Sequence, residues 1–252
     1  MEFSGKVVVI TGGSRGIGRA VAEAFAERGA RVAVHYNRNR SAAEDTLKSL
    51  RGGAHMIVQA DVAVPDQVKD MIDQAASAMG RIDVLVNNAG IYEMHPPGSV
   101  GYETWRDSWR RTIDVNLMGA ANASYCAARK MIAQGGGKII NITSRGAFRG
   151  EPEGPAYAAS KAGQNAMSQS LAKALAPHKI YVYAVAPGWV ATDMAAEHLA
   201  GPEGESIRSQ SPLNRVATPE EIARAVVLLA SEGTDYMTGC ILDVNGASYL
   251  RS

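Results

Sequence analysis

TGGSRGIG, residues 11–18, lies where a β-branched run, Lys6–Ile10, ends and a segment of helical period, Gly16–Arg28, begins. Glycines at such a turn let the backbone approach a phosphate, and the helix N-terminus offers free N–H donors and the positive end of its dipole. A nucleotide triphosphate loop would need lysine and then serine or threonine after its last glycine, but Arg19 and Ala20 follow this turn. The stretch therefore predicts a pyrophosphate site at the first strand–helix junction, the alternative being a tight turn without a ligand.

Alternation of short apolar strands with helical segments continues along the chain. Further strands are expected at residues 31–36, 55–60, 82–87, 138–143, 180–186 and 240–244. Parallel strands need covered crossovers, so helices should lie on both faces of the sheet. The sequence thus predicts the α/β class, with a doubly wound seven-stranded parallel sheet in a single domain, residues 1–252. Residues 194–212, MAAEHLAGPEGESIRSQSP, interrupt this alternation and are expected to be flexible.

Composition excludes several classes of partner. The 26 basic and 25 acidic residues give a net charge of +1, so no global field recruits nucleic acid or an anionic membrane. The 5 histidines and 2 cysteines lack metal-ligand or redox spacing, so no metal is predicted. The first residues, MEFSGK, do not resemble a signal peptide, and no apolar run approaches the ~18 residues that span a bilayer, which favours a cytoplasmic protein.

A hydroxyl, a phenol and an ammonium follow downstream at Ser144, Tyr157 and Lys161. A carbonyl that receives a hydride becomes an alkoxide, which needs a proton and charge stabilisation. Tyr157 and Lys161 are four residues apart and share one helix face, so Lys161 is expected to lower the pKa of the phenol from its usual ~10. Ser144, at the end of the fifth strand, would hold the substrate oxygen. The alternative makes Tyr157 an interface aromatic and Lys161 a surface charge.

The charged residues after the second expected strand indicate whether the cofactor is NAD(H) or NADP(H). Residues 35–38 read HYNR, without the Asp or Glu that would bind the ribose 2′-hydroxyl of NAD. Arg15 in the glycine turn and Arg38 could both meet a 2′-phosphate, which predicts NADP(H). NAD(H) remains the alternative if Arg38 and Arg40 are solvated loop charges.

Together the motifs resemble the short-chain dehydrogenase/reductase family over essentially the whole chain. The turn Gly12-x3-Gly16-x-Gly18 is of that family's TGxxxGxG type rather than the common GxGxxG fingerprint. It is followed, in the family's order, by Asp61, Asn87-Asn88-Ala89-Gly90, Asn116, Ser144, Tyr157-x3-Lys161 and Pro187-Gly188. The overall resemblance is to compact bacterial 3-oxoacyl-acyl-carrier-protein reductases, and it implies an NAD(P)-dependent oxidoreductase (EC 1.1.1.-) with a Rossmann fold.

The resemblance assigns roles residue by residue. The implied catalytic set is Asn116, which helps to hold a water chain leading to the lysine, with Ser144, Tyr157 and Lys161. Implied cofactor contacts are Gly12, Ser14, Arg15, Gly16, Ile17, Gly18, Asn37, Arg38, Asp61, Val62, Asn88, Ala89, Gly90, Tyr157, Lys161, Pro187, Gly188, Val190 and Thr192. Within this set Asp61 and Val62 would meet the adenine, Asn88 and Ala89 the ribose, and Val190 and Thr192 the nicotinamide carboxamide.

Three alternatives for the function stay open, and two of them differ in the substrate. Related enoyl reductases would place lysine at position 164, where this chain has Gln164, so carbonyl reduction is favoured. The resemblance implies a 3-oxoacyl thioester, but residues 134–138 and 177–179 are weakly basic for docking an acyl carrier protein. A small polar or sugar-like alcohol or ketone is the alternative, and a noncatalytic NADP sensor the second. Residues that could line a polar pocket, or be ordinary loop residues, are Tyr92, Glu93, His95, Arg145, Glu151 and Trp189.

Trp105 and Trp109 stand four residues apart among Arg106, Arg110 and Arg111. This pattern is typical of an amphipathic helix with tryptophans inward and arginines solvated, rather than of a nucleic-acid surface. In the family, this helix and the one that carries Tyr157 form a subunit interface, which implies a homotetramer first and a dimer second.

Overall fold

A seven-stranded parallel sheet forms the centre of the computed structural model, which describes residues 2–251. Its order is β3-β2-β1-β4-β5-β6-β7. Successive strands are therefore added toward one edge as far as β3 and toward the opposite edge from β4 onward, so the strand order reverses between β1 and β4. The strands are β1 (Val7–Ile10), β2 (Arg31–Tyr36), β3 (Met56–Gln59), β4 (Val84–Asn87), β5 (Gly137–Ile142), β6 (Ile180–Pro187) and β7 (Ile241–Val244). This confirms the predicted doubly wound sheet, whose ligand crevice lies where neighbouring strands diverge at their carboxyl ends.

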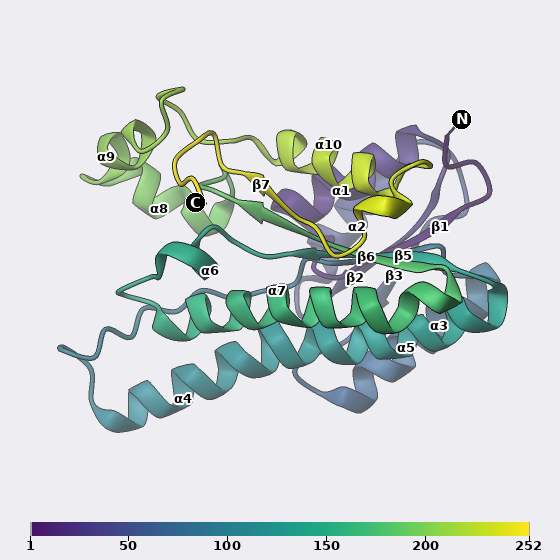
Figure 1. Cartoon of the computed structure of the whole chain (residues 1–252), viewed down its shortest axis with the longest axis horizontal. Coiled ribbons are helices and arrows are strands. Elements are labelled where there is room, and N and C mark those ends of the chain that lie inside the picture. The colour runs from purple at the N-terminus through teal and green to yellow at the C-terminus, as the bar shows by residue number, and fades with distance from the viewer. Residues whose placement is uncertain (1, 252) are drawn as a thin grey trace.

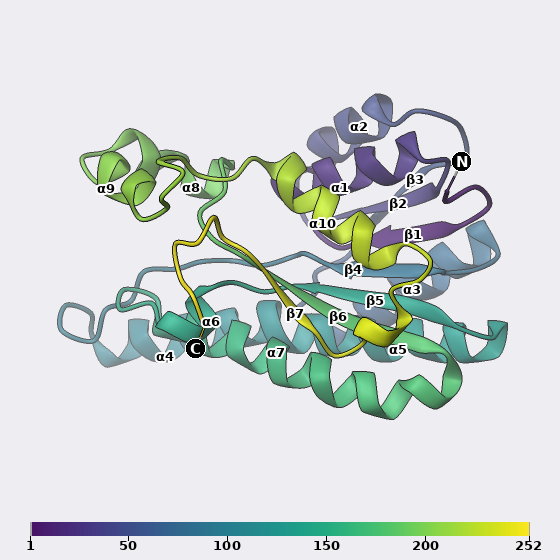
Figure 2. The same cartoon turned by 45° about the horizontal axis from the view of Figure 1, so that its top comes forward.

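Helices cover both faces of the sheet (Figures 1 and 2). On one face lie α1 (Gly16–Glu27), α2 (Arg40–Ser49) and α10 (Pro219–Ala230), and on the other α3 (Pro65–Met79), α4 (Tyr102–Ile113), α5 (Gly119–Gln134) and α7 (Pro155–Leu175). A hydrophobic core lies on each face of the sheet, and successive strand residues point into opposite cores. Val8 and Ile10 pack on the α1 and α10 side, while Val7 and Val9 pack on the α3 and α5 side. Burial on both faces explains why β1 reads as a continuous apolar run.

Residues 194–212, expected to be flexible, instead form most of two short helices, α8 (Asp193–Ala200) and α9 (Gly204–Ser209). Each helix has an apolar anchor, because Ala195 and Ile207 are buried. The glycines end one helix and begin the next: a Cβ at Gly204 would lie 2.2 Å from the carbonyl oxygen of Leu199. The sequence pattern did not predict these helices, because the glycines were interpreted as a loop signal rather than as a tight helix–helix junction; the flexibility of the segment stays a prediction.

Smaller elements complete the chain. They are the π-helical η1 (Asp114–Met118), α6 (Gly146–Arg149) and the 3₁₀ turns η2 (Ala176–His178) and η3 (Asp235–Met237).

Helix α4 has the predicted amphipathic character. The rings of Trp105 and Trp109 pack against the buried His95, with centroids 5.5 and 6.5 Å from it, while Arg106 and Arg110 are exposed. Along residues 2–251, no helix combines the length and apolar character needed to cross a bilayer.

Candidate active site

The glycine turn after β1 lies at the point where strand order reverses. Gly12 and Gly16 have φ values of +63° and +53°, and a Cβ at Gly18 would lie 2.2 Å from the carbonyl oxygen of Gly12. Only glycine therefore suits these positions. Arg15, the N-cap of α1, makes no side-chain capping bond, and the first turn of α1 holds no acidic residue. A bare, uncapped helix N-terminus behind a glycine cradle fits a cofactor pyrophosphate.

His35 braces this turn from β2. Its Nδ1 accepts a hydrogen bond from the Gly12 N–H at 2.9 Å, and its Nε2 lies 3.0 Å from the carbonyl oxygen of Ala60, to which it donates. The ring is 2% exposed, and burial lowers the pKa of His35, which favours the neutral tautomer this geometry requires. Sequence reasoning missed this role, although a histidine near the end of an otherwise apolar buried strand was its signal.

Thr11 and Asn88 tie the turn to β4. The Thr11 hydroxyl accepts from the backbone N–H groups of Asn88 and Ala89, both at 3.0 Å. The Asn88 amide donates to the carbonyl oxygens of Thr11 and Gly12 at 3.0 and 2.9 Å. Asn88 thus holds the turn through its side chain, a role additional to the ribose contact expected for it.

The other predicted cofactor residues lie along the same edge of the sheet. Thr192 reaches the turn, because a Cβ at Gly16 would lie 3.2 Å from Thr192 Cγ2. Asn37 and Arg38 are exposed just beyond β2, and Arg15 is exposed 3.7 Å from Asp193. The remaining positions occupy the turn itself or the ends of the strands, with Val62 and Val190 buried and Asp61, Gly90 and Gly188 half-buried. By contrast Arg40, which was considered with Arg38, pairs with Glu44 at 2.8 Å.

Lys161 is only 3% exposed. Its Nζ donates to the carbonyl oxygen of Ile142 at 2.8 Å and to Gln164 Oε1 at 3.1 Å, and lies 5.7 Å from the centroid of the Tyr157 ring. Burial lowers the pKa of Lys161 to about 7. The amine is therefore poised to gain or lose a proton near neutral pH.

Tyr157 differs from expectation. Burial raises its pKa to about 12, although a hydrogen bond with Ser144 opposes the rise. The prediction that Lys161 lowers this pKa is wrong for the structure as it stands, for two reasons. Ile142 and Gln164 hold the amine, and its own lowered pKa leaves it only about half charged at neutral pH.

Ser144 lies two residues beyond β5, as expected. Its Oγ accepts a hydrogen bond from the Gly146 N–H at 3.0 Å, which fixes the hydroxyl at the start of α6. The Ser144 hydroxyl lies near the phenol of Tyr157, because it lowers the pKa of that phenol. Ser144, Tyr157 and Lys161 are thus gathered from β5 and α7 onto the carboxyl edge of the sheet.

Asn116 is fully buried in the π-helical segment η1. Its Oδ1 accepts from the Ile91 N–H at 2.8 Å, and its Nδ2 donates to the carbonyl oxygen of Ile91 and to Ser160 Oγ, both at 3.0 Å. The Asn116 carbonyl oxygen, turned out of the regular helix ladder, accepts from Gln164 Nε2 at 2.7 Å. Gln164 therefore bridges Asn116 and Lys161, a role that sequence reasoning missed because Gln164 was considered only as a position lacking lysine.

Only some of the residues expected to line a polar pocket lie at the candidate site or line a cavity. Tyr92 packs edge-on against Tyr157 with ring centroids 5.3 Å apart. Glu93 instead pairs with Arg111 at 2.8 Å, and His95 is fully buried, accepting from the Ala156 N–H at 3.2 Å. Glu93 therefore supports α4, and His95 supports the start of α7, rather than a pocket.

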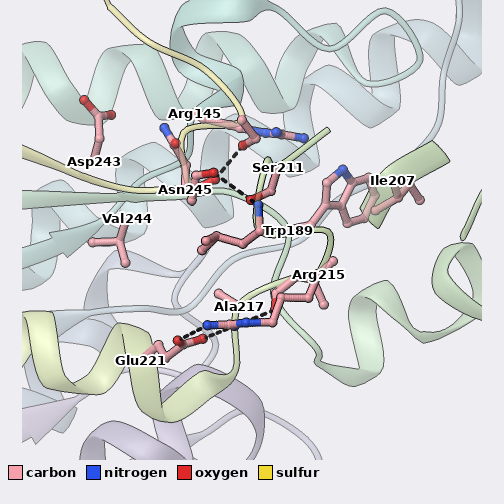
Figure 3. Close-up of a pocket in the computed structure, with 14 residues that line it drawn as sticks. Arg145, Trp189, Ile207, Ser211, Arg215, Ala217, Glu221, Asp243, Val244 and Asn245 are labelled. Atoms are coloured by element: carbon pink, nitrogen blue, oxygen red, sulfur yellow. Dashed lines mark hydrogen bonds and ion pairs between the residues drawn. The ribbon is translucent and has the colours of Figure 1, made fainter. Parts of the chain in front are cut away.

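Arg145 and Trp189 do line a cavity of about 290 Å³ (Figure 3). Arg145 follows Ser144 directly, and Trp189 follows the Pro187-Gly188 turn. Glu151 is half-buried near both Arg145 and Tyr157, since its charge affects the pKa of each. The cavity therefore reaches the residue that follows Ser144, although neither Ser144 nor Tyr157 lines it.

Comparison with known proteins identifies the class. Residues 12–247 match the family described as enoyl-(acyl carrier protein) reductase. With the parallel sheet and the Ser–Tyr–Lys arrangement, this match shows that the chain belongs to the short-chain dehydrogenase/reductase family, whose members are nicotinamide-dependent oxidoreductases.

Individual relatives agree over nearly the full length. An uncharacterized oxidoreductase of Methylorubrum extorquens is 38% identical over 251 residues, covering 97% of this chain and 98% of the relative. A 3-oxoacyl-acyl-carrier-protein reductase of Staphylococcus epidermidis is 38% identical over 247 residues, covering 97% and 99%. The crystal structure of a short-chain dehydrogenase from Burkholderia cenocepacia in complex with NADP superposes with a TM-score of 0.91 at 32% identity, covering 98% and 99%.

Proposed function

We propose that this protein is an NADP(H)-dependent oxidoreductase that interconverts a carbonyl and a secondary alcohol (EC 1.1.1.-). The observation that carries the proposal is the gathering of Ser144, Tyr157 and the buried Lys161 beside a glycine cradle suited to a pyrophosphate. The nicotinamide cofactor supplies or accepts the hydride at the substrate carbon. The chain's own residues manage the oxygen and its proton.

Tyr157 keeps its proton at neutral pH because burial raises its pKa to about 12. During reduction the carbon–oxygen π bond breaks, and the new alkoxide oxygen takes the phenolic proton. Ser144 holds that oxygen from a second direction. Lys161, with its pKa lowered to about 7, then returns a proton to Tyr157, and the same groups run in reverse during alcohol oxidation.

The preference for NADP(H) over NAD(H) is supported by the exposed Arg38 and Arg15 and by the absence of a carboxylate among residues 35–38. Within residues 2–251, Arg38 forms no ion pair with a carboxylate. A guanidinium that remains free beyond β2 suits a 2′-phosphate. The relative from B. cenocepacia, crystallised with NADP, agrees with this choice.

The first substrate class proposed is a 3-oxoacyl thioester, because relatives with that activity in their names share 38% identity over nearly the whole chain. Two observations favour the second class, a small polar or sugar-like ketone. Lys130, a basic residue close in sequence to the weakly basic segment 134–138, pairs with Asp73 at 2.7 Å. The cavity of about 290 Å³ lies at the small end of ligand pockets. Carbon–carbon double-bond reduction is disfavoured because Gln164, not lysine, occupies the position that related enoyl reductases use.

We further propose a cytoplasmic homotetramer, with a dimer second. Tyr102 on α4 and Tyr125 on α5 are 76% and 68% exposed, and apolar rings this open suit a subunit interface. Light scattering coupled to size exclusion measures the assembly directly.

A substrate panel tests the proposed activity. Purified protein is mixed with NADPH and, separately, with 3-oxoacyl thioesters, ketoses and small diketones, while NADPH absorbance is followed. Oxidation of NADPH with formation of the matching alcohol supports the proposal and ranks the classes. Tight NADPH binding without oxidation across the panel would instead support a noncatalytic NADP sensor.

A further inference from the structure

Arg145 is a buried cation that forms no ion pair within residues 2–251, because the nearby Glu151, whose charge raises the pKa of Arg145, pairs with Arg149 at 3.4 Å. Its side chain is 3% exposed, and its Nη2 donates to Gln210 Oε1 at the end of α9. Its Nη1 is buried and has no hydrogen-bond partner within residues 2–251, and no carboxylate of that range pairs with it. Burial lowers the pKa of Arg145 to about 10. An unpaired buried charge is costly, which points to a partner that the folded chain does not itself provide.

The cavity that Arg145 lines contains other charges, but these are neutralised locally. Glu221 and Arg215 pair at 2.7 Å across the cavity from Arg145 (Figure 3). Asp243 pairs with Arg251 at 2.7 Å. Among the described lining residues, Arg145 therefore carries the one uncompensated charge.

The position of Arg145 relates this charge to catalysis. Ser144, the preceding residue, lies near the phenol of Tyr157 and lowers its pKa. The cavity reaches Trp189, which follows the Pro187-Gly188 turn where the nicotinamide is expected. Neither Ser144 nor Tyr157 lines the cavity, so a substrate whose carbonyl lies between them must extend past Ser144 to reach Arg145.

We propose that Arg145 binds a carboxylate of the substrate, so that the protein reduces small oxo acids to hydroxy acids or oxidises them in reverse. A singly charged carboxylate matches one free guanidinium, whereas a dianionic phosphate would bring a second negative charge that no described lining residue balances. This inference rests on the proposed oxidoreductase activity. It selects a carboxylate-bearing member of the small polar class over a long acyl thioester.

The test compares each oxo acid with its own neutral ester. Pyruvate, acetoacetate and 4-oxopentanoate are assayed with NADPH beside their methyl esters, using wild type, Arg145→Met, Arg145→Lys and Gln210→Met. Wild type is expected to favour at least one acid over its ester by at least about tenfold in kcat/KM. Arg145→Met should lose roughly tenfold or more on that acid and change little on the ester, and Arg145→Lys should recover part of the loss.

Gln210→Met is the matched control, because it removes the contact of Arg145 with α9 and leaves the guanidinium in place. If Arg145 serves only to anchor α9, Gln210→Met will reproduce the loss, and the proposal fails. Equal loss on acids and esters in Arg145→Met would also overturn it. If Arg145→Met does not fold, the wild-type preference for acids over esters and the change of that preference in Arg145→Lys test the proposal.

A binding measurement separates this inference from the proposed function. Malonate, which carries carboxylates but no reducible ketone, is titrated into wild type and Arg145→Lys by calorimetry. Arg145-dependent malonate binding without turnover of any carbonyl would keep the carboxylate site and reject the oxidoreductase. Turnover of esters alone, with no malonate binding, would keep the oxidoreductase and reject the carboxylate site, and the absence of both binding and turnover would reject both.

Discussion

Gln164 joins Lys161 to Asn116 through one side-chain amide. Its Oε1 accepts from Lys161 Nζ at 3.1 Å, and its Nε2 donates to the carbonyl oxygen of Asn116 at 2.7 Å. The amide therefore fixes the lysine that we propose returns a proton to Tyr157. All of these groups are buried, so neither hydrogen bond has an easy substitute in water.

Changing Gln164 should alter the pH dependence of turnover. Gln164→Leu removes an acceptor from the buried amine and is expected to lower kcat about tenfold. Gln164→Glu places a carboxylate beside Lys161, which favours the charged amine, so the pH limb that reports this lysine should move upward. The measurement is kcat against pH for wild type and both variants, with NADPH affinity as the control. Identical pH profiles would show that Gln164 only fills space.

Burial of Lys161 should make stability depend on pH. Its pKa is about 7 in the folded protein and near 10.5 when unfolded, so between these values the unfolded chain binds more protons. The contribution of this lysine to stability therefore rises with pH through that window, by about 1.4 kcal/mol per pH unit. Denaturant unfolding of wild type and Lys161→Met at pH 7, 8 and 9 measures it. The free energy of unfolding of wild type should rise relative to that of Lys161→Met as pH rises. A constant difference between the two free energies would contradict a lowered pKa of Lys161.

His35 should control the glycine turn through its acceptor nitrogen. In His35→Leu the Gly12 N–H loses its partner, and we expect NADPH to bind roughly tenfold more weakly. In His35→Asn the side-chain oxygen can take the place of Nδ1, so binding should be largely retained. Fluorescence titration with NADPH compares the two, and equal weakening in both would assign the effect to packing instead.

The choice of cofactor should depend on Arg38. Arg38→Asp puts a carboxylate beyond β2, which repels a 2′-phosphate and can accept a hydrogen bond from a ribose hydroxyl. NADPH should bind at least about tenfold more weakly, while NADH binds equally well or better. Arg40→Asp is the control, because Arg40 already pairs with Glu44. Wild-type protein that prefers NADH would refute the assignment.

The sheet and the gathering of Ser144, Tyr157 and Lys161 were predictable from the sequence because both follow from local patterns. Apolar runs such as Val7–Ile10 define buried parallel strands, and the spacing of Tyr157 and Lys161 puts them on one helix face. The glycine turn could be placed for the same reason, because its steric requirement acts on neighbouring residues.

Other features could not be predicted because they depend on contacts between distant segments. His35 meets Gly12 from another strand, and Arg145 meets Gln210 across 65 positions of sequence. The direction of the Tyr157 pKa shift depends on burial and on what holds Lys161, neither of which the spacing reveals. Whether the chain is one domain throughout and assembles as a tetramer stays a prediction.

The most direct measurement is turnover by Tyr157→Phe on a substrate that wild type reduces. Phenylalanine keeps the ring that packs against Tyr92 and removes only the hydroxyl that donates the proton. We predict that kcat falls by about 1000-fold while the Kd for NADPH stays within about twofold. Tyr102→Phe, at a tyrosine that is 76% exposed on α4, should leave both values unchanged. Turnover by Tyr157→Phe within a few-fold of wild type would contradict the assignment of Tyr157 as the proton donor.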